Sequence, residues 1–209
     1  MSSQVTIIDY GLGNLHSLEK AMEHLGAEVS VDVDGSAIAD AERIIIPGVG
    51  AFPEGMNGMI ARNQVDEVRE FAASGRPVMG ICLGCQLLLS TSEEFGEREG
   101  LGIIPGKVVP LPAESASVPH VGWSRLQINE SGRSAAGEKL STFTNGTWTY
   151  FVHSYHCQPA DDHHRLAVCG HGDAVLTAAV GRDNILGFQF HPEKSSSEGL
   201  RMLEEFLQL

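Results

Sequence analysis

The sequence predicts a three-layer α/β fold with a mixed, largely parallel central sheet, and three observations lead to it. Short apolar strands alternate with helical patterns through the first half of the chain, which is typical of a parallel sheet with helices on both faces. The run Val78-Met79-Gly80-Ile81 is apolar throughout, as expected for a strand buried on both faces. From about Gly102 onward, short strand-like segments replace this alternation, so hairpins are expected to replace crossovers there.

The first half divides into strands and helices by its apolar spacing. Strands are expected at Val5–Asp9, Val29–Val33, Arg43–Ile46 and Val78–Ile81. Leu15, Leu18, Met22 and Leu25 recur at helical spacing until Gly26, so a helix is expected between the first two strands. A polar helix is expected from about Gln64 to Ser74, and Leu87-Leu88-Leu89 reads as a helical pattern after the last strand.

The second half reads as a series of short strands closed by one helix. Strands are expected at 103–104, 107–109, 125–128, 147–152, 165–168, 174–180 and 185–190. Asp183-Asn184 is a plausible hairpin turn between the last two. Ser131–Gly146 is expected to be a surface loop, and an amphipathic helix is expected from Ser195 onward. There is no linker and no repeat, so residues 1–209 are expected to form a single domain.

Composition and charge exclude several classes of protein. The chain has 209 residues, 42% of them hydrophobic, which is enough for a real core. Its 14 basic and 27 acidic residues give a net charge of 14 − 27 = −13, which opposes binding to nucleic acid or to an anionic membrane surface. The apolar runs are far shorter than the ~18–20 residues that span a bilayer. The N-terminus lacks the basic start and apolar stretch of a signal peptide, so a cytoplasmic location is expected.

The sharpest motif is Gly80-Ile81-Cys82-Leu83-Gly84, a G-x-C-x-G placed where a buried strand gives way to a helical pattern. Glycines two positions before and after a nucleophile allow a tight strand-to-helix turn, because a Cβ at either position would collide with neighbouring backbone. A cysteine at a helix N-terminus is favoured as the thiolate. The backbone N–H of Leu83 would then face a developing oxyanion. The motif therefore predicts that Cys82 is a nucleophile.

Other interpretations of Cys82 remain open at this stage. Cysteine is often simply a core residue. Cys82 and Cys85 also form a C-x-x-C, which elsewhere marks a redox pair or half of a zinc site. Cys157 and Cys169 form no second C-x-x-C, although His156 and His171 could complete a ligand set.

A second motif, His191-Pro192-Glu193, follows directly after an apolar strand. The histidine and the glutamate are two positions apart, so in an extended segment both point to one side. A carboxylate so placed can hold one imidazole nitrogen, which leaves the other free to accept and return a proton. Because the chain has nine histidines, this motif gains weight only together with a nucleophile.

Two glycine-containing loops complete the set of candidate sites. Pro47-Gly48-Val49-Gly50 ends a predicted strand, and a backbone N–H of this loop could be a second oxyanion donor or the loop could be an ordinary turn. Tyr10-Gly11-Leu12-Gly13-Asn14 begins like a dinucleotide-binding fingerprint, but the third glycine position is His16. We therefore expect no nucleotide cofactor.

Together these motifs resemble the class I (triad) glutamine amidotransferases, and the resemblance covers the whole chain. Within that class the sequence is similar to the family of glutaminase subunits of imidazole glycerol phosphate synthase. That closer similarity rests on the segments Pro119-His120-Val121-Gly122-Trp123 and Tyr150-Phe151-Val152-His153-Ser154, and on the residues that surround His191.

The resemblance implies an activity and a set of site residues. Cys82 would attack the side-chain amide of glutamine to give a glutamyl thioester and ammonia, with His191 serving both steps and Glu193 orienting it. Water would then release glutamate. The matching positions that would hold glutamine or its oxyanion are Val49, Gly50, Leu83, Gln86, Glu94, Ser154 and Tyr155. No cofactor and no metal ion are expected.

The resemblance also implies a partner. Ammonia would pass to a cyclase subunit of (β/α)8 barrel fold, with which the chain would form a heterodimer. That subunit would build imidazole glycerol phosphate and an aminoimidazole carboxamide ribotide, which links histidine and purine biosynthesis. Trp123 is a candidate interface anchor in a glycine-bordered loop, although packing in its own core is an equally open interpretation.

Two departures from the family pattern and two alternatives stand beside this assignment. Cys85 stands where the family usually has methionine or glutamine, and Ser124 stands where asparagine is usual. Another two-subunit triad glutaminase, such as that of pyridoxal phosphate synthase, lacks support from the P-H-V-G-W segment. A non-catalytic binding module of the same fold would have no need for Cys82, His191 and Glu193 together.

Overall fold

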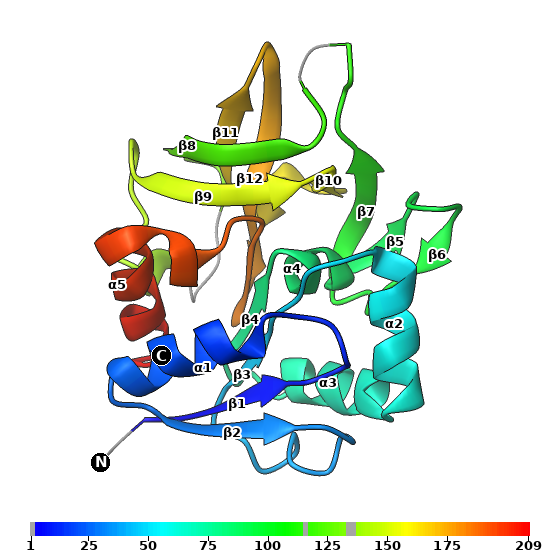
Figure 1. The fold of residues 1–209 in the computed structure, drawn as a ribbon, viewed down its shortest axis with the longest axis vertical. Coiled ribbons are helices and arrows are strands. Elements are labelled where there is room, and N and C mark those ends of the chain that lie inside the picture. The colour runs from blue at the N-terminus through cyan, green and yellow to red at the C-terminus, as the bar shows by residue number, and fades with distance from the viewer. Residues whose placement is uncertain (1–2, 115–116, 133–136) are drawn as a thin grey trace.

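The computed structural model describes residues 3–114, 117–132 and 137–209, and a mixed sheet runs through its centre (Figure 1). Among the described residues this sheet has nine strands. In spatial order they are β2 (Glu28–Asp32), β1 (Gln4–Ile8), β3 (Ile44–Ile46), β4 (Val78–Ile81), β13 (Ile185–Phe188), β12 (Ala174–Arg182), β11 (Arg165–His171), β8 (His120–Ile128) and β9 (Trp148–His153).

The direction of the strands changes in the middle of this sheet. The pairings from β2 to β13 are parallel, and those from β13 to β9 are antiparallel. The change occurs because Asp183-Asn184 turns β12 back into β13, as the sequence predicts. The parallel part, which is the half that carries Cys82, makes up four of the eight pairings given by these strands.

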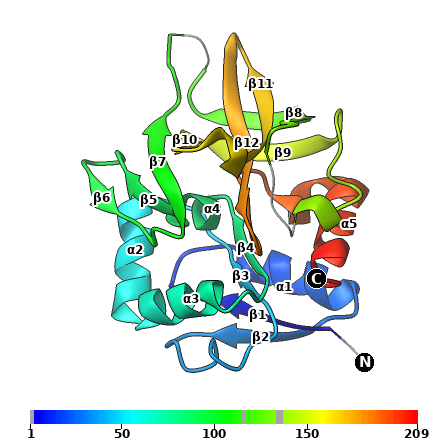
Figure 2. The ribbon, with the colours of Figure 1, turned by 180° about the vertical axis from the view of Figure 1, so that it is seen from behind.

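Helices cover both faces of the parallel half, so the fold has three layers (Figures 1 and 2). Helices α1 (Leu15–His24) and α5 (Ser196–Phe206) pack in one hydrophobic cluster. Helices α2 (Phe52–Ala61), α3 (Gln64–Ala73) and α4 (Leu83–Leu87) pack in the other. Alternate residues of one strand serve the two clusters: Ile7 faces the first and Ile8 the second. Both are completely buried.

A smaller sheet lies on the α4 side of the molecule. Its order is β10 (Tyr155–Pro159), β7 (Ile104–Pro110), β5 (Leu89–Ser92) and β6 (Arg98–Glu99). Ile104, Val108 and Cys157 bury its inner face in the second hydrophobic cluster. Three single-turn helices complete the described structure: η1 (Gly137–Lys139), η2 (Asp162–His164) and η3 (Pro192–Lys194).

Helix α2 was not predicted, because two glycines interrupt its apolar pattern. Gly58 is required for packing and Gly55 lies in a tight contact. A Cβ on Gly58 would lie 2.1 Å from the carbonyl oxygen of Tyr10, and one on Gly55 would lie 3.3 Å from Leu83 and Leu87 side-chain atoms. The close approach between α2 and its neighbours favours glycine at these two positions, and glycine is a poor helix former, so the sequence pattern does not indicate a helix.

Other boundaries differ from those expected. The helical pattern through Leu89 was wrong: α4 ends at Leu87, and Leu89 begins β5, where it pairs with Ile104 of β7. Strand β8 begins at His120, five residues before the expected start at Arg125 and inside the expected Trp123 loop. Strands β6 and β10 were not predicted. Part of the expected loop Ser131–Gly146, residues 133–136, lies outside the described residues, and η1 falls within that loop.

No described helix has both the length and the apolarity needed to cross a membrane. No group of three or more His, Cys, Asp or Glu side chains in the described parts of the chain is arranged to hold a metal ion.

Candidate active site

Cys82 occupies a strained turn between β4 and α4. Its φ is 54° and its ψ is −108°, a backbone conformation that is costly for a residue with a side chain. A Cβ on Gly80 would lie 2.6 Å from the carbonyl oxygen of Gly84, and a Cβ on Gly84 would lie 1.7 Å from that of Ile46. Both glycines are therefore required for the turn, as the G-x-C-x-G motif predicts.

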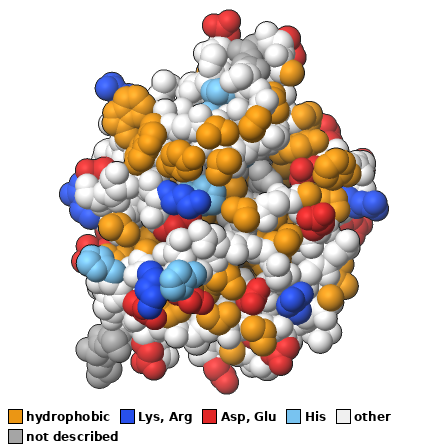
Figure 3. Space-filling model, in the orientation of Figure 1, with side chains coloured by type: hydrophobic (Ala, Val, Ile, Leu, Met, Phe, Trp, Pro, Cys, Tyr) orange, Lys and Arg blue, Asp and Glu red, His pale blue; other side chains and the backbone are white. Residues whose placement is uncertain are grey.

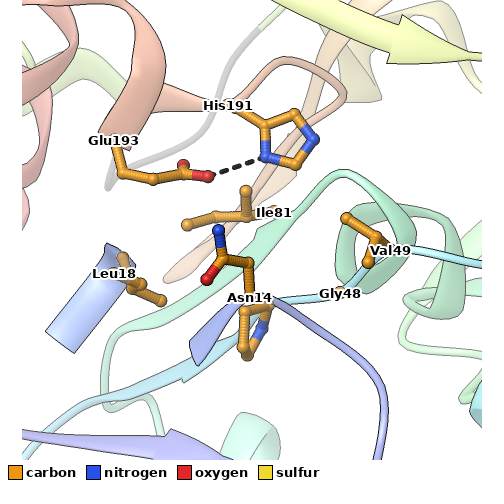
Figure 4. A pocket seen from close by; sticks show the side chains of 8 residues that line it. Asn14, Leu18, Gly48, Val49, Ile81, His191 and Glu193 are labelled. Carbon is orange, nitrogen blue, oxygen red and sulfur yellow. Dashed lines mark hydrogen bonds and ion pairs between the residues drawn. The ribbon is translucent and has the colours of Figure 1, made fainter. Parts of the chain in front are cut away.

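His191 and Glu193 lie at the end of the neighbouring strand. Strand β13 pairs with β4 in parallel, and the Cys82 N–H donates to the carbonyl oxygen of Phe188 at 2.7 Å. Both chains therefore leave the same edge of the sheet side by side. His191 Nδ1 lies 2.8 Å from Glu193 Oε1, and both side chains are more than nine-tenths buried. Figure 4 shows the imidazole and the carboxylate joined in this way.

The charge state of His191 reflects its neighbours. Burial lowers its pKa, but Cys82 and Glu193 act in the opposite direction and raise that pKa to about 9 overall. His191 Nε2 is buried and makes no hydrogen bond of standard geometry to any described residue. Nδ1 is held by the carboxylate, so Nε2 is the nitrogen that remains for the thiol of Cys82, whose interaction with the ring favours the imidazolium.

A cavity of about 360 Å³ opens beside Cys82. It is lined by Cys82 and by all seven residues that the resemblance assigns to glutamine or its oxyanion: Val49, Gly50, Leu83, Gln86, Glu94, Ser154 and Tyr155. Pro119, Val152 and His153 complete the lining. Residues from five separate segments of the chain thus converge on one cavity next to the thiol.

The expected oxyanion donor is already engaged. The Leu83 N–H donates to the carbonyl oxygen of Gly48 at 3.3 Å. The adjoining carbonyl of Pro47 accepts a short hydrogen bond from the Tyr10 hydroxyl, and Tyr10 is itself buried. The loop Pro47–Gly50 was expected to supply a second oxyanion donor. In this conformation its Gly48 carbonyl instead accepts the N–H of Leu83, the first expected donor.

A second hollow, of only about 10 Å³, lies against His191 and Glu193 (Figure 4). Asn14 and Leu18 line it together with Gly48, His191 and Glu193. Neither Asn14 nor Leu18 was predicted as a site residue. The segment Tyr10–Asn14 fails as a nucleotide-binding fingerprint and contributes to the family resemblance, but neither argument assigns a role to Asn14.

Cys85, the second cysteine of the C-x-x-C, faces away into the core. Its Sγ lies 3.6 Å from that of Cys157, and both side chains are completely buried. Burial is the main cause that raises the pKa of the Cys85 thiol. All four cysteines, which lie in the described residues, are free thiols. The geometry of Cys85 is that of a core residue and favours neither a redox pair with Cys82 nor a zinc site.

Sequence reasoning missed two further groups near the thiol. The Gln189 Nε2 group lies 3.9 Å from Cys82 Sγ, and Gln86 Nε2 donates to Gln189 Oε1 at 3.1 Å and to the Tyr155 carbonyl at 2.9 Å. His153 lines the cavity and bonds to His120. Both residues belong to segments that resemble the glutaminase family: His153 lies in Tyr150–Ser154, and Gln189 lies two positions before His191. Local spacing does not reveal contacts between residues so far apart in the sequence.

Comparison with known proteins places this site in a family. Residues 6–209 match the family described as glutamine amidotransferase class-I. The chain is 39% identical to imidazole glycerol phosphate synthase subunit HisH 1 of Legionella pneumophila strain Lens, with 99% of this chain and all of that one covered. It is 43% identical to subunit HisH of Rhodopirellula baltica, with 97% and 96% covered.

Solved structures support the same fold. A crystal structure of a glutamine amidotransferase superposes with a TM-score of 0.74 at 20% identity and covers 98% of this chain and 97% of its own. PurLQS from Thermotoga maritima gives a TM-score of 0.73, also at 20% identity, with 100% and 99% covered. The fold class and the family expected from the motifs are therefore confirmed. The chain belongs to the class-I glutamine amidotransferases and, within them, to the HisH subunits of imidazole glycerol phosphate synthase.

Proposed function

We propose that this HisH subunit hydrolyses glutamine to glutamate and ammonia with Cys82, His191 and Glu193 as its catalytic triad. The observation that carries the proposal is the shared edge of β4 and β13. At this edge a strained cysteine that lines a cavity of about 360 Å³ lies next to the chain segment that carries a buried His-Glu pair. A strained nucleophile with an adjacent, oriented base is the arrangement that activates a thiol for acyl transfer.

Each step of the reaction has a group to perform it. His191 Nε2 takes the thiol proton, and the Cys82 sulfur attacks the amide carbon of glutamine. The imidazolium returns the proton to the departing nitrogen, and the carbon–nitrogen bond breaks. Ammonia departs, and a glutamyl thioester remains on Cys82. Water, deprotonated by the same imidazole, then attacks the thioester, and the sulfur leaves with the proton as glutamate forms. Glu193 fixes the ring and stabilises its charged form.

The remaining cavity residues hold the substrate in this proposal. Glu94 presents a carboxylate suited to the substrate ammonium group, although one of its oxygens already accepts the Phe52 N–H at 2.7 Å. Gln86, Ser154 and Tyr155 line the same cavity. For Leu83 to serve the oxyanion together with Val49 or Gly50, its bond to the Gly48 carbonyl must open.

The activity is tested by measuring glutamate release from glutamine with and without a cyclase subunit and its ribonucleotide substrate. We expect glutamate and ammonia in equal amounts, with a higher rate in the assembled complex because the engaged Leu83 N–H limits the isolated chain. A complex that makes product from ammonia but releases no glutamate from glutamine would disprove the glutaminase assignment.

We further propose a single domain over residues 1–209, a cytoplasmic location, and a heterodimer with a (β/α)8 barrel cyclase that takes up the ammonia. The outer face of β8 and β9 supports the partner. Exposed apolar side chains gather there, as Figure 3 shows over these strands: Val121, Trp123, Trp148 and Val152. An apolar face of this kind is typical of an interface. Trp123 stands on the β8 strand, not in a loop, and is 46% exposed.

Trp123→Ala is expected to weaken association with the cyclase by about 2 kcal/mol, the scale of an aromatic interface anchor. The isolated chain should keep its melting temperature, because nearly half of the side chain is exposed and its main ring contact is edge-on to Tyr150 at 5.9 Å. Calorimetric titration with the cyclase measures the first quantity. Val175→Ala, at a residue 69% exposed on β12, is the control. Unchanged affinity, or a melting loss as large as a core truncation gives, would contradict the assignment.

A further inference from the structure

A chain of hydrogen bonds runs from β8 to the wall of the glutamine cavity. Ser124 Oγ lies 3.0 Å from His120 Nε2, and His120 Nδ1 lies 2.9 Å from His153 Nε2. His153 Nδ1 lies 2.8 Å from the carbonyl oxygen of Tyr155. The three side chains are at least nine-tenths buried, and the hydrolysis described above uses none of them.

The last member of the chain determines the position of every proton. A carbonyl oxygen can only accept, so His153 Nδ1 must carry the hydrogen. Burial lowers the pKa of His153 to about 3 and that of His120 to about 4, so both rings are neutral. His153 Nε2 is then bare and accepts from His120 Nδ1, and His120 Nε2 is bare and accepts from the Ser124 hydroxyl.

Packing holds the His120 ring in this orientation. The ring stacks on Phe151 at 4.8 Å between centroids and on His171 at 4.1 Å. His171 is itself fixed, because its Nε2 lies 2.7 Å from the carbonyl oxygen of Ser117. A tilt of the His120 ring would break both stacks, and a half-turn flip would take its nitrogens away from Ser124 and His153, so a change at Ser124 acts on the tautomer of a ring whose position is fixed.

The far end of the chain meets the groups around the nucleophile. The Tyr155 carbonyl that accepts from His153 also accepts from Gln86 Nε2 at 2.9 Å. Gln86 in turn contacts Gln189, whose Nε2 lies 3.9 Å from Cys82 Sγ. His153, Gln86 and Tyr155 all line the cavity, whereas Ser124 and His120 do not.

We propose that Ser124 and His120 are positioning residues for glutamine, acting through His153 to hold the Tyr155 carbonyl and the Gln86 side chain in the arrangement that accepts the substrate. The inference rests on the proposed function, because it concerns the same cavity. Without a donor at Ser124, His120 Nε2 is left buried and unpaired, and the alternative tautomer of His120 turns a bare Nδ1 toward the bare Nε2 of His153. Two acceptors then face each other, and the Tyr155 wall loses its anchor.

Substitutions at Ser124 test the chain without touching the cavity. Ser124→Ala in the assembled complex should raise KM for glutamine about tenfold, the scale of one buried hydrogen bond, and should change kcat less than twofold. Ser124→Asn keeps a donor and should stay close to the wild-type KM. Ser124→Val fills the site but offers no hydrogen-bonding group, so its KM should rise at least as far as that of Ser124→Ala.

Two controls separate this role from packing and from folding. Ser30→Ala removes a hydroxyl bonded at 2.8 Å to Thr6 on the far side of the sheet and should leave KM unchanged. Melting temperatures identify any variant that fails to fold. Nitrogen-15 shifts of the imidazoles report the tautomers: His120 should carry its hydrogen on Nδ1 in the wild type and in Ser124→Asn.

The outcomes are distinguishable. Equal KM values for the asparagine and valine variants, or a wild-type KM for Ser124→Ala in a folded protein, would overturn the positioning role while leaving the glutaminase assignment intact. A wild-type complex that releases no glutamate would overturn the assignment on which the role depends.

Discussion

Cys82→Ser is expected to abolish glutamate release, with a loss on the order of 10⁴-fold or more, as for removal of other catalytic nucleophiles. A serine hydroxyl at this turn is a far poorer nucleophile than a thiol beside an imidazole. The fold should survive, because serine is smaller than cysteine and the φ of 54° at this position is held by the flanking glycines. Glutamate release at saturating glutamine, with the melting temperature recorded alongside, measures both effects.

Cys85→Ala is the matched control for that substitution. It removes the other sulfur of the C-x-x-C, which lies against Cys157 in the core, so it should cost about 1 kcal/mol in stability and leave most of the activity. Methionine is less suitable there, because a Cβ placed on Gly187 would already lie 2.8 Å from Cys85 Sγ. An electrophilic glutamine analogue should label Cys82 alone. Equal inactivation by the two substitutions, or stoichiometric zinc in the purified protein, would refute the nucleophile assignment.

His191→Ala should eliminate glutamine-dependent synthesis by the assembled complex while ammonia-dependent synthesis continues. Free ammonia needs no thiol chemistry, whereas glutamine hydrolysis needs the proton that His191 takes and returns. Measuring product formation from each nitrogen source, with the same preparation, separates a chemical role from a structural one. Loss of both activities together would mean that His191 supports the assembly instead of the reaction.

A second variant protects that test against misfolding. The alanine leaves Glu193 buried without its partner at 2.8 Å, which costs stability. His191→Asn keeps a side-chain N–H for the carboxylate but has no basic nitrogen, so it should fold better and be equally inactive with glutamine. Glu193→Gln should lower glutamine-dependent activity less than either His191 variant, because Glu193 orients the ring and does not itself transfer a proton. His163→Ala, at a side chain 70% exposed, should change neither activity.

Local sequence rules predicted the parts of the site that are themselves local. The strained turn at Cys82 follows from Gly80 and Gly84, because a Cβ on either glycine would collide with a backbone atom. That atom lies a few residues away for Gly80 and on the adjacent strand for Gly84. The pairing of His191 with Glu193 follows from their spacing. The cavity lining was reached through the family resemblance, because no spacing rule joins Val49 to Tyr155.

Features that depend on distant side chains were not predictable in this way. The bond from Leu83 to Gly48 depends on how one loop settles against another, and the chain from Ser124 to Tyr155 depends on ring packing across two strands. Strand β8 was recognised only in its second half, because Gly122 and the exposed Val121 and Trp123 give its first half the composition of a loop. In each case tertiary contacts decide what local periodicity leaves open.

The position of β13 in the central sheet has a consequence for biosynthesis. This strand is the last to be made, yet it enters between β4 and β12. Until β13 emerges from the ribosome, β4 has an unpaired edge on that side. Cys82, which follows β4, then lacks both Gln189, 107 residues further along the chain, and the base His191 just beyond it. Such long-range closure is slow and comes late in folding. On the proposed assignment, the thiol meets its base only when the sheet is complete, so a subunit truncated before β13 is expected to release no glutamate from glutamine.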